Sequence, residues 1–471
     1  MSEAKLSDLP NCILIHILSF LNTKEAVRTC ILSKRWEHIW KYIPTLILHY
    51  SDFSTLKSFD KFMYRVLSLR DDSVLPHTID FDRSGGLKSG LLKKVAYYVL
   101  SHNVKLLRLR IDVKGDIGDI LPCISSCQTL TSLKLSVSPK GRYNYGRTLF
   151  PKSLNLTALT FLHLGNFAFC AGDDGLVEPF SAFNSLNSLI IDNCTVKDAQ
   201  ILCISSEKLV SLTMRNHYFD VYQIELSAPS LCTFSFMGTP YQKFRGSSLS
   251  SVEQVNIDAD MLAYYLEPPL VLLSWLSDLP NIKSLTVSAS TLQVLSFVPD
   301  ILKDKLLSAS LMRSLKSLKV KLKPLSCGLS MASKITNFDK ELKTGFKPSS
   351  LIPDGILDLL LKNSPSADVD ILECSRIDDS FDHLAPFSSS LFPEFLQPSS
   401  NEHVMADLER RLQHLKQVKL QLKLYIHLAT KEKIILEREE LIALEEYEIM
   451  FLKTIAVLER QMRQMRDIEA L

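Results

Sequence analysis

Apolar residues recur in a fixed arrangement along the middle of the chain. The arrangement is apolar–x–x–apolar–x–apolar, and it occurs nine times, first at residues 104–109 and last at residues 315–320. The last two apolar residues of each unit lie two positions apart, so in an extended chain both point to the same side. Such a unit buries its apolar side only by stacking on its neighbours. The pattern therefore predicts a curved parallel sheet over residues 104–325.

The interval between the units indicates which kind of repeat they form. Successive units begin 21–33 residues apart, and most intervals fall within the range of about 20–29 residues that is typical of leucine-rich repeats. Cys194 follows Ile191 by three residues, where such a repeat places Asn or Cys to bond the turning backbone. The expected fold class is α/β, with a leucine-rich-repeat solenoid as its main part.

The first fifty residues carry a different apolar pattern, one with helical spacing. Residues 12–21 are apolar except for His16 and Ser19, and a helix that is apolar on nearly all sides must be buried on more than one. Two further short helices are expected before Pro44. Three short helices cannot bury this much apolar surface among themselves, so the surplus faces either the rest of the chain or another protein.

The remainder of the chain divides into three segments. Residues 51–103 form a transition into the solenoid, with helical stretches and a short strand. Residues 326–400 are rich in Pro and Ser, which predicts a linker or a long loop. Residues 401–471 contain neither Pro nor Gly and predict one strand, in HLKQVKLQL, followed by a long helix or a coiled coil.

Polar residues alternate with the inward-pointing residues of the repeat units. They would line the exposed face of the sheet, where the backbone fixes their positions. This face could be a merely solvated surface or a recognition surface, and we favour recognition for the face as a whole. The candidate target-binding residues on it are Arg108, Arg110, Lys134, His163, Arg215 and Lys319.

Composition narrows the classes of partner and of activity. The net charge of +2 gives no reason to expect nucleic acid or a membrane surface as the main partner. The ten cysteines lack the Cys/His spacing of a metal site, so no metal or other cofactor is expected. No phosphate loop, HExxH or GxSxG motif is present, and we do not expect an enzyme. No signal peptide or membrane span is apparent, which predicts a cytoplasmic or nuclear protein.

Three motifs of the N-terminal segment resemble the plant form of the F-box. They are LPNCILIHILSFL at residues 9–21, AVRTC at residues 26–30 and LSKRWEHIWKYIPTL at residues 32–46. The resemblance implies a three-helix F-box at residues 1–50 that docks a Skp-family adaptor and, through it, a cullin. The contact residues that it implies are Leu9, Pro10, Ile13, Ile17, Leu18, Leu21, Val27, Leu32 and Trp36.

The combination of this segment with the repeats is similar to plant F-box/leucine-rich-repeat proteins. Residues 401–471 also resemble, in HLKQVKLQL and EIMFLKTIAVLERQM, the FBD module that often closes such proteins. The resemblance implies a substrate-recognition subunit of an SCF-type cullin–RING ubiquitin ligase, with an unknown protein as target. Two alternatives stay open: a leucine-rich-repeat scaffold outside any ligase, and an F-box receptor that needs a small ligand.

Overall fold

The chain folds as two compact units in the computed structural model. The first unit comprises residues 1–258 and 278–285, and the second comprises residues 259–277 and 286–471. The structure describes residues 9–70, 77–83, 89–111, 124–137, 148–151, 154, 156–171, 176–216, 222–245, 249–261, 267–298, 313–322, 352–353 and 355–373.

The first unit begins with the helical segment that was expected from the sequence. Helix α1 spans Asn11–Leu18 and starts directly after Pro10, whose ring fixes a backbone angle compatible with a helix start. Helix α2 spans Thr23–Arg28, and the side chain of Asn22 caps it by accepting a hydrogen bond of 2.8 Å from the backbone N–H of Glu25. The neutral polar cap satisfies one of the donors that a helix start leaves open.

The third helical segment is shorter than the sequence predicts. It is a turn of 3₁₀ helix at Ile39–Tyr42, and another such turn, Thr29–Ile31, follows α2. Ile43 already has an extended backbone, because the ring of Pro44 disfavours a helical conformation in the preceding residue. The segment therefore consists of two α-helices joined to 3₁₀ turns.

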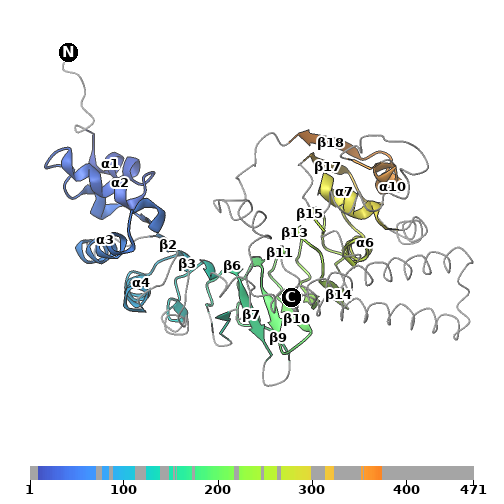
Figure 1. Cartoon of the computed structure of the whole chain (residues 1–471), viewed down its shortest axis with the longest axis horizontal. Helices are drawn as coiled ribbons and strands as arrows, with labels where there is room; N and C mark the ends of the chain where they lie inside the picture. The colour runs from blue at the N-terminus through green and yellow to red at the C-terminus, as the bar shows by residue number, and fades with distance from the viewer. Residues whose placement is uncertain are drawn as a thin grey trace, which may run out of the picture. The chain divides into compact units, whose positions relative to one another are not determined.

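A parallel sheet of twelve strands follows (Figure 1). Every strand pair for which the register is known is parallel. The strands, in their order across the sheet, are β1 (Thr45–His49), β2 (Thr78–Arg83), β3 (Leu106–Ile111), β4 (Ser132–Val137), β6 (Phe161–Gly165), β8 (Ser188–Asp192), β11 (Ser211–Asn216), β13 (Thr233–Gly238), β15 (Gln254–Ala259), β16 (Ser284–Ser288), β17 (Ser317–Leu322) and β18 (Asp368–Glu373). This order confirms the leucine-rich-repeat fold class.

The nine apolar units form the core of this sheet. All three apolar residues of every unit are buried, from Val104, Leu107 and Leu109 to Leu315, Leu318 and Val320. Each unit contributes one strand, from β3 to β17, and its second and third apolar residues alternate with polar ones. The predicted burial of the repeat pattern is thus confirmed in every unit.

The sheet begins two strands before the first apolar unit. Strand β1 directly follows the helical segment, and helix α3 (Leu56–Leu69) lies between it and β2 in the sequence. Helix α4 (Ser89–Ser101) leads from β2 to β3. The hydroxyl of Thr23 in α2 accepts a 2.9 Å hydrogen bond from the backbone N–H of Ile47 in β1. This bond joins the N-terminal helices to the edge of the sheet.

Six further strands form two small parallel sheets. They contain β5 (Thr148–Leu149), β7 (Phe167–Cys170) and β9 (Thr195–Lys197), and β10 (Ile201–Ser205), β12 (Gln223–Ser227) and β14 (Lys243–Arg245). They belong to the segments that connect β4 to β15. Extended backbone is favoured there because aromatic and β-branched residues recur in these short runs, as in FAFC and TVK.

The second unit corrects part of the linker expected at residues 326–400. Residues 356–361 form helix α10 (Ile356–Leu361), and β18 pairs in parallel with β17. The register places Asp370 opposite Lys319, so opposite charges support the pairing. Composition missed β18 because its apolar residues Val369 and Ile371 are exposed and belong to no leucine unit.

Several expectations lie outside the described residues. They include the strand and long helix expected at residues 401–471 and the linker character of residues 326–351 and 374–400. Where the structure does describe the chain, it holds no helix that is both long and apolar enough to cross a membrane. Two candidate surfaces belong to the first unit. They are the apolar face of the N-terminal helices and the polar face of β2 to β11.

Candidate functional site

The N-terminal helices expose a group of large apolar side chains. Phe20 is 74% exposed and Ile31 is 83% exposed, although both side chains are large and apolar. Ile13 and Leu32 are also exposed. Ile13 and Phe20 are seven residues apart, which places them on the same side of α1 and of the turn that continues it. Exposed apolar groups of this size are typical of a protein–protein contact.

The structure separates the nine expected adaptor contacts into accessible and buried residues. Pro10, Ile13 and Leu32 are exposed, and Leu9, Ile17, Leu21 and Val27 are partly exposed. Leu18 and Trp36 are the exceptions, with 1% and 2% of their surfaces exposed. The expectation of direct contact is therefore corrected for these two residues, which belong to the core.

The burial of Trp36 has a structural reason. Ile39 and Trp40 of the 3₁₀ turn that follows it are buried as well, so one side of this segment packs inward. Its neighbour Arg35 points the other way and donates hydrogen bonds to the backbone carbonyl of Leu9 and to Oδ1 of Asn11, the latter at 3.0 Å. Arg35 thereby holds the start of α1 against the third segment.

Sequence reasoning missed Phe20 and Ile31 as contact candidates. The spacing from Ile13 through Ile17 to Phe20 was the available signal, since it continues one helical face. For Ile31 no such signal exists, because the sequence places it on the buried face of α2. The helix instead ends at Arg28 and continues as the 3₁₀ turn, which rotates Ile31 outward.

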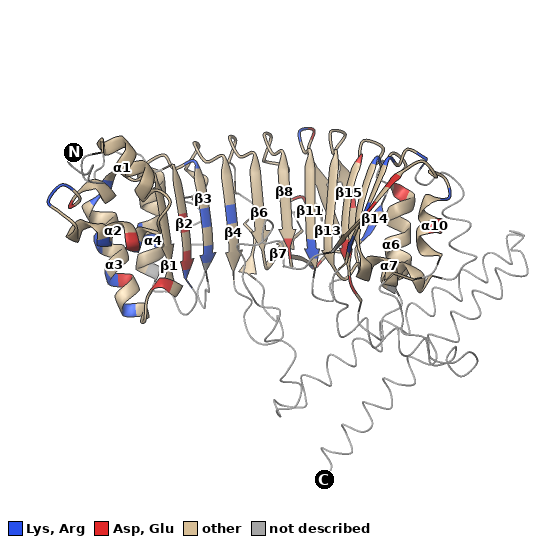
Figure 2. Cartoon of the chain, turned by 90° about the horizontal axis from the view of Figure 1, so that it is seen from above, with Lys and Arg blue, Asp and Glu red and all other residues tan. Residues whose placement is uncertain are grey.

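Polar residues occupy matching register positions on neighbouring strands of the sheet and so form two rows; Figure 2 colours the charged positions on the strands. In the first row the register places Asp80, Arg108, Lys134 and His163 side by side on β2, β3, β4 and β6. In the second row it places Asp82, Arg110, Ser136, Gly165, Asp192 and Arg215 side by side on β2, β3, β4, β6, β8 and β11. The sheet thus brings together five of the six expected target-binding residues.

Lys319, the sixth, lies on β17 in the second unit and is exposed there.

Carboxylates on β2 neutralise the basic residues of β3. Arg108 lies 2.9 Å from Asp80, and Arg110 lies 3.1 Å from Asp82. Asp80 is shared with His49 of β1, whose Nε2 lies 3.2 Å away. The contact with Asp80 raises the pKa of His49. Burial acts to raise the pKa of Asp80, but its bonds to His49 and Arg108 outweigh burial and lower it. Both basic residues of β3 are therefore paired with carboxylates.

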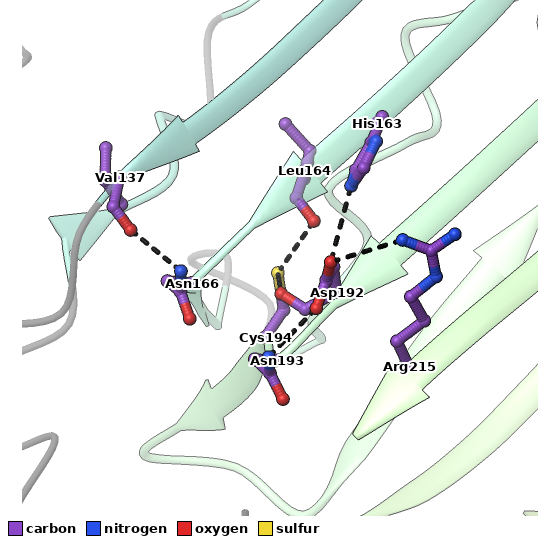
Figure 3. A network of polar contacts seen from close by, with 8 residues as sticks. All are labelled: Val137, His163, Leu164, Asn166, Asp192, Asn193, Cys194 and Arg215. Carbon is purple, nitrogen blue, oxygen red and sulfur yellow. Dashed lines mark hydrogen bonds and ion pairs between the residues drawn. The ribbon is translucent and has the colours of Figure 1, made fainter. Parts of the chain in front are cut away.

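A second shared carboxylate lies in the middle of the face (Figure 3). Asp192 lies 3.6 Å from Nε2 of His163 and 3.8 Å from the guanidinium of Arg215. His163 is only 2% exposed. Burial lowers its pKa, against the opposing effect of Asp192. His163 is thus a neutral, buried side chain that positions Asp192 rather than an accessible contact residue.

The turns after β6 and β8 fix the ends of these strands (Figure 3). Asn166 and Asn193 both have positive φ, which Asn tolerates better than most residues. The amide of Asn166 donates a 2.9 Å hydrogen bond to the carbonyl of Val137. The thiol of Cys194 lies 3.5 Å from the carbonyl of Leu164 in the preceding repeat. The expected role of Cys194 in bonding the turning backbone is thereby confirmed.

Lys134 differs from the other basic residues of the face. Where the structure describes the chain, no carboxylate lies within ion-pair distance of its ammonium group. Burial and the nearby guanidinium groups of Arg108, Arg110 and Arg215 lower its pKa to about 8. The side chain is therefore the surplus cation of the face.

No group of three or more potential metal ligands occurs in the described part of the chain. The seven cysteines that the structure describes are all free thiols.

Comparisons with known proteins agree with both parts of this structure. Residues 6–48 match the F-box domain family. An F-box/LRR-repeat protein of Arabidopsis thaliana is 28% identical over 321 residues, which are 64% of this chain and 81% of the relative. An F-box/FBD/LRR-repeat protein of the same plant is 27% identical over 317 residues, which are 62% of this chain and 66% of the relative.

A third relative, an FBD-associated F-box protein of the same plant, is 25% identical over 297 residues, 61% of this chain and 71% of the relative. The F-box match at residues 6–48 covers the apolar N-terminal helices described above. This chain therefore carries an F-box domain ahead of a leucine-rich-repeat sheet and is a homologue of plant F-box/LRR-repeat and F-box/FBD/LRR-repeat proteins.

Proposed function

We propose that this protein is the substrate-recognition subunit of an SCF-type cullin–RING ubiquitin ligase. F-box domains generally bind Skp-type adaptors, and this chain contains one at residues 6–48. The observation that carries the proposal is the exposed apolar surface formed by Ile13, Phe20, Ile31 and Leu32. These residues, named here the adaptor surface, would be buried by the adaptor, and the cullin would be recruited through it.

The polar face of the sheet supports the second half of this function. It places charged side chains of β2 to β11 in two rows at fixed spacing, which suits the recognition of a target protein. The protein itself would contribute no catalytic residue, and ubiquitin transfer would be carried out by its partners. Such a subunit would act in the cytoplasm or the nucleus.

The first prediction concerns the adaptor surface. Replacing Phe20 and Ile31 together by Ser should weaken binding of a Skp-family adaptor by roughly a thousandfold, since buried anchors of an interface commonly contribute about 2 kcal/mol each, or about thirtyfold in affinity per residue. The fold should be unaffected, because both side chains are already exposed. Isothermal titration calorimetry with the purified full-length chain and adaptor measures the effect.

Tyr97→Ser provides the matched control. Tyr97 is an equally large side chain, 61% exposed, but it lies on α4, outside the adaptor surface. This variant should bind the adaptor as the wild type does. Wild-type protein that binds no adaptor at all would refute the ligase function. Equal binding by the wild type and the Phe20/Ile31 variant would refute the adaptor surface.

A further inference from the structure

We propose that Lys134 and Ser136 of β4 form a binding site for a single carboxylate side chain of the target protein. The inference rests on the proposed target-recognition function and names the chemistry that the strand face recognises. Lys134 and Ser136 lie two residues apart on one strand, so both point to the exposed face of the sheet, at roughly 7 Å between their Cα atoms.

Both side chains offer hydrogen-bond donors that the structure leaves unused. Among the described residues, neither the ammonium of Lys134 nor the hydroxyl of Ser136 has a hydrogen-bond or ion-pair partner. The adjacent basic residues are already bound: Arg108 and Arg110 contact carboxylates of β2. Two unused donors side by side match the two oxygens of one carboxylate.

The space beside Ser136 is kept open for its hydroxyl. Residue 165, its register partner on β6, is Gly. A Cβ atom at this position would lie 2.3 Å from Oγ of Ser136. Any side chain at residue 165 would therefore displace the hydroxyl. Because residue 165 is Gly, no side chain on β6 competes with the Ser136 hydroxyl for this space.

The net charge of the face indicates how much negative charge its ligand should carry. Four cations, Arg108, Arg110, Lys134 and Arg215, face three carboxylates, Asp80, Asp82 and Asp192. The pKa of His163 is lowered, and His49 lies on β1 paired with Asp80, so Lys134 contributes the one positive charge without a carboxylate partner among the described residues. A carboxylate carries one negative charge and balances this positive charge. A phosphate near pH 7 carries about 1.5 to 2 negative charges, which is more than the face would neutralise. A carboxylate is therefore the better match.

An unpaired, half-buried ammonium group is unfavourable for the unliganded protein. The lowered pKa of Lys134 reflects both its burial and the repulsion by Arg108, Arg110 and Arg215. An incoming carboxylate would relieve this repulsion and restore the pKa towards its ordinary value. Binding and protonation of Lys134 are therefore coupled, which provides a direct spectroscopic readout.

The test follows the ammonium group of Lys134 by NMR in the full-length protein. Lysines are labelled by reductive methylation with ¹³C-formaldehyde, and the Lys134 signal is identified by its loss in Lys134→Met. The probe is the peptide acetyl-Gly-Ser-Glu-Ser-Gly-amide, compared with the same peptide carrying Gln or phosphoserine in place of Glu. We expect the Glu peptide to shift the Lys134 signal saturably and to raise the pKa of Lys134.

Each comparison has a defined outcome. The Gln peptide should bind at least about tenfold more weakly, because it loses a charge-assisted hydrogen bond. Ser136→Ala should weaken binding of the Glu peptide, whereas Lys197→Met, at an exposed lysine of β9 outside the polar face, should leave its binding unchanged. No saturable shift, or equal binding of the Glu and Gln peptides, would overturn the proposal. Tighter binding of the phosphoserine peptide by more than tenfold would identify a phosphate site instead.

The same protein preparation is titrated with the Skp-family adaptor. Adaptor binding without a response to the Glu peptide would refute the carboxylate site and leave the ligase function standing. A response to the Glu peptide without adaptor binding would refute the ligase function and leave the carboxylate site standing. The two proposals therefore fail separately.

Discussion

At the scale of residues, shared carboxylates organise the polar face of the sheet. Asp80 contacts both His49 and Arg108, and Asp192 contacts both His163 and Arg215. Each carboxylate thus neutralises a neighbour on another strand, so Arg108 and Arg215 are paired with carboxylates. Lys134 lies between these two clusters and has no such partner among the described residues, which makes its charge available to a ligand.

The unpaired charge of Lys134 should lower the free energy of unfolding of the wild-type protein. Lys134→Met should raise the free energy of unfolding at pH 7 by about 1–3 kcal/mol, because each unit of pKa depression corresponds to about 1.4 kcal/mol and solvent reduces the effect. If Lys134 had a purely structural role, Lys134→Met would lower the free energy of unfolding instead. Urea denaturation of both proteins, followed by circular dichroism, measures the difference.

The difference should also depend on pH in a definite direction. The pKa of Lys134 is about 8 in the folded protein and 10.5 in an unfolded chain, so the unfolded state binds the extra proton between these values. Stability of the wild type therefore rises with pH across this window, and its deficit against Lys134→Met should close between pH 8 and 10.5. The groups facing Lys134 are Arg108, Arg110, His163, Asp192 and Arg215. A pH-independent deficit would contradict the unpaired ammonium.

At the scale of elements, three strands of the sheet, β6, β8 and β13, end at residues with special backbone requirements. Asn166 and Asn193 adopt positive φ after β6 and β8, and Gly238 does so at the end of β13 with φ of 114°. Gly238 also lies against the backbone of β11, where the carbonyl of Asn216 accepts a 2.8 Å hydrogen bond from the N–H of Thr239. This close approach holds the ends of β11 and β13 together.

Gly238→Ala should therefore destabilise the sheet. A Cβ atom at this residue would lie 2.0 Å from the carbonyl oxygen of Asn216, and φ of 114° is unfavourable for any residue with a side chain. We expect a loss of about 2 kcal/mol or more in the free energy of unfolding. Differential scanning fluorimetry and urea denaturation check this loss.

Gly90→Ala is the corresponding control. Gly90 lies in helix α4, and its Cβ would meet only the hydroxyl of Tyr64 at 3.6 Å, an ordinary van der Waals distance. The substitution should be neutral or stabilising by up to about 1 kcal/mol, since Ala favours the helix. A tolerated Gly238→Ala would mean that the turn after β13 can relax away from β11.

At the scale of the molecule, the adaptor surface and the carboxylate site both belong to the first unit. The adaptor surface lies on the N-terminal helices, whereas the carboxylate site lies on β4, and β1, β2 and β3 separate them within the sheet. Thr23 joins the helices to the sheet by its hydrogen bond to Ile47. A bound target would thus be held on the same folded body as the adaptor.

The two surfaces should nevertheless act independently. Distant sites without shared partners contribute additively, usually to within about 0.5 kcal/mol. Replacing Phe20 and Ile31 by Ser should abolish adaptor binding and leave the response to the Glu peptide intact, and Lys134→Met should do the reverse. Combining the substitutions should give the sum of the single effects in calorimetry and NMR. Loss of both activities in any single-site variant that remains folded would contradict this separation.

The sequence by itself determined the period of the sheet, its buried residues and the F-box. Apolar residues such as Leu133 and Leu135 are spaced two apart with the polar Lys134 between them, so both lie on one side of a strand, and core and strand followed from local pattern. The position of Cys194 in its turn followed from the spacing of the repeat. The sequence also identified most of the residues that line the exposed face.

Only the tertiary structure decided which charges meet and which apolar residues stay exposed. Arg108 is neutralised by Asp80, 28 residues earlier, because β2 pairs with β3 in one register, and β2 carries no leucine unit that would have revealed this pairing. Ile31 is exposed because helix α2 gives way to a 3₁₀ turn, and Trp36 is buried together with Ile39 and Trp40. Local spacing fixes which side of a strand a residue faces, but its neighbours across strands depend on contacts between residues far apart in the chain.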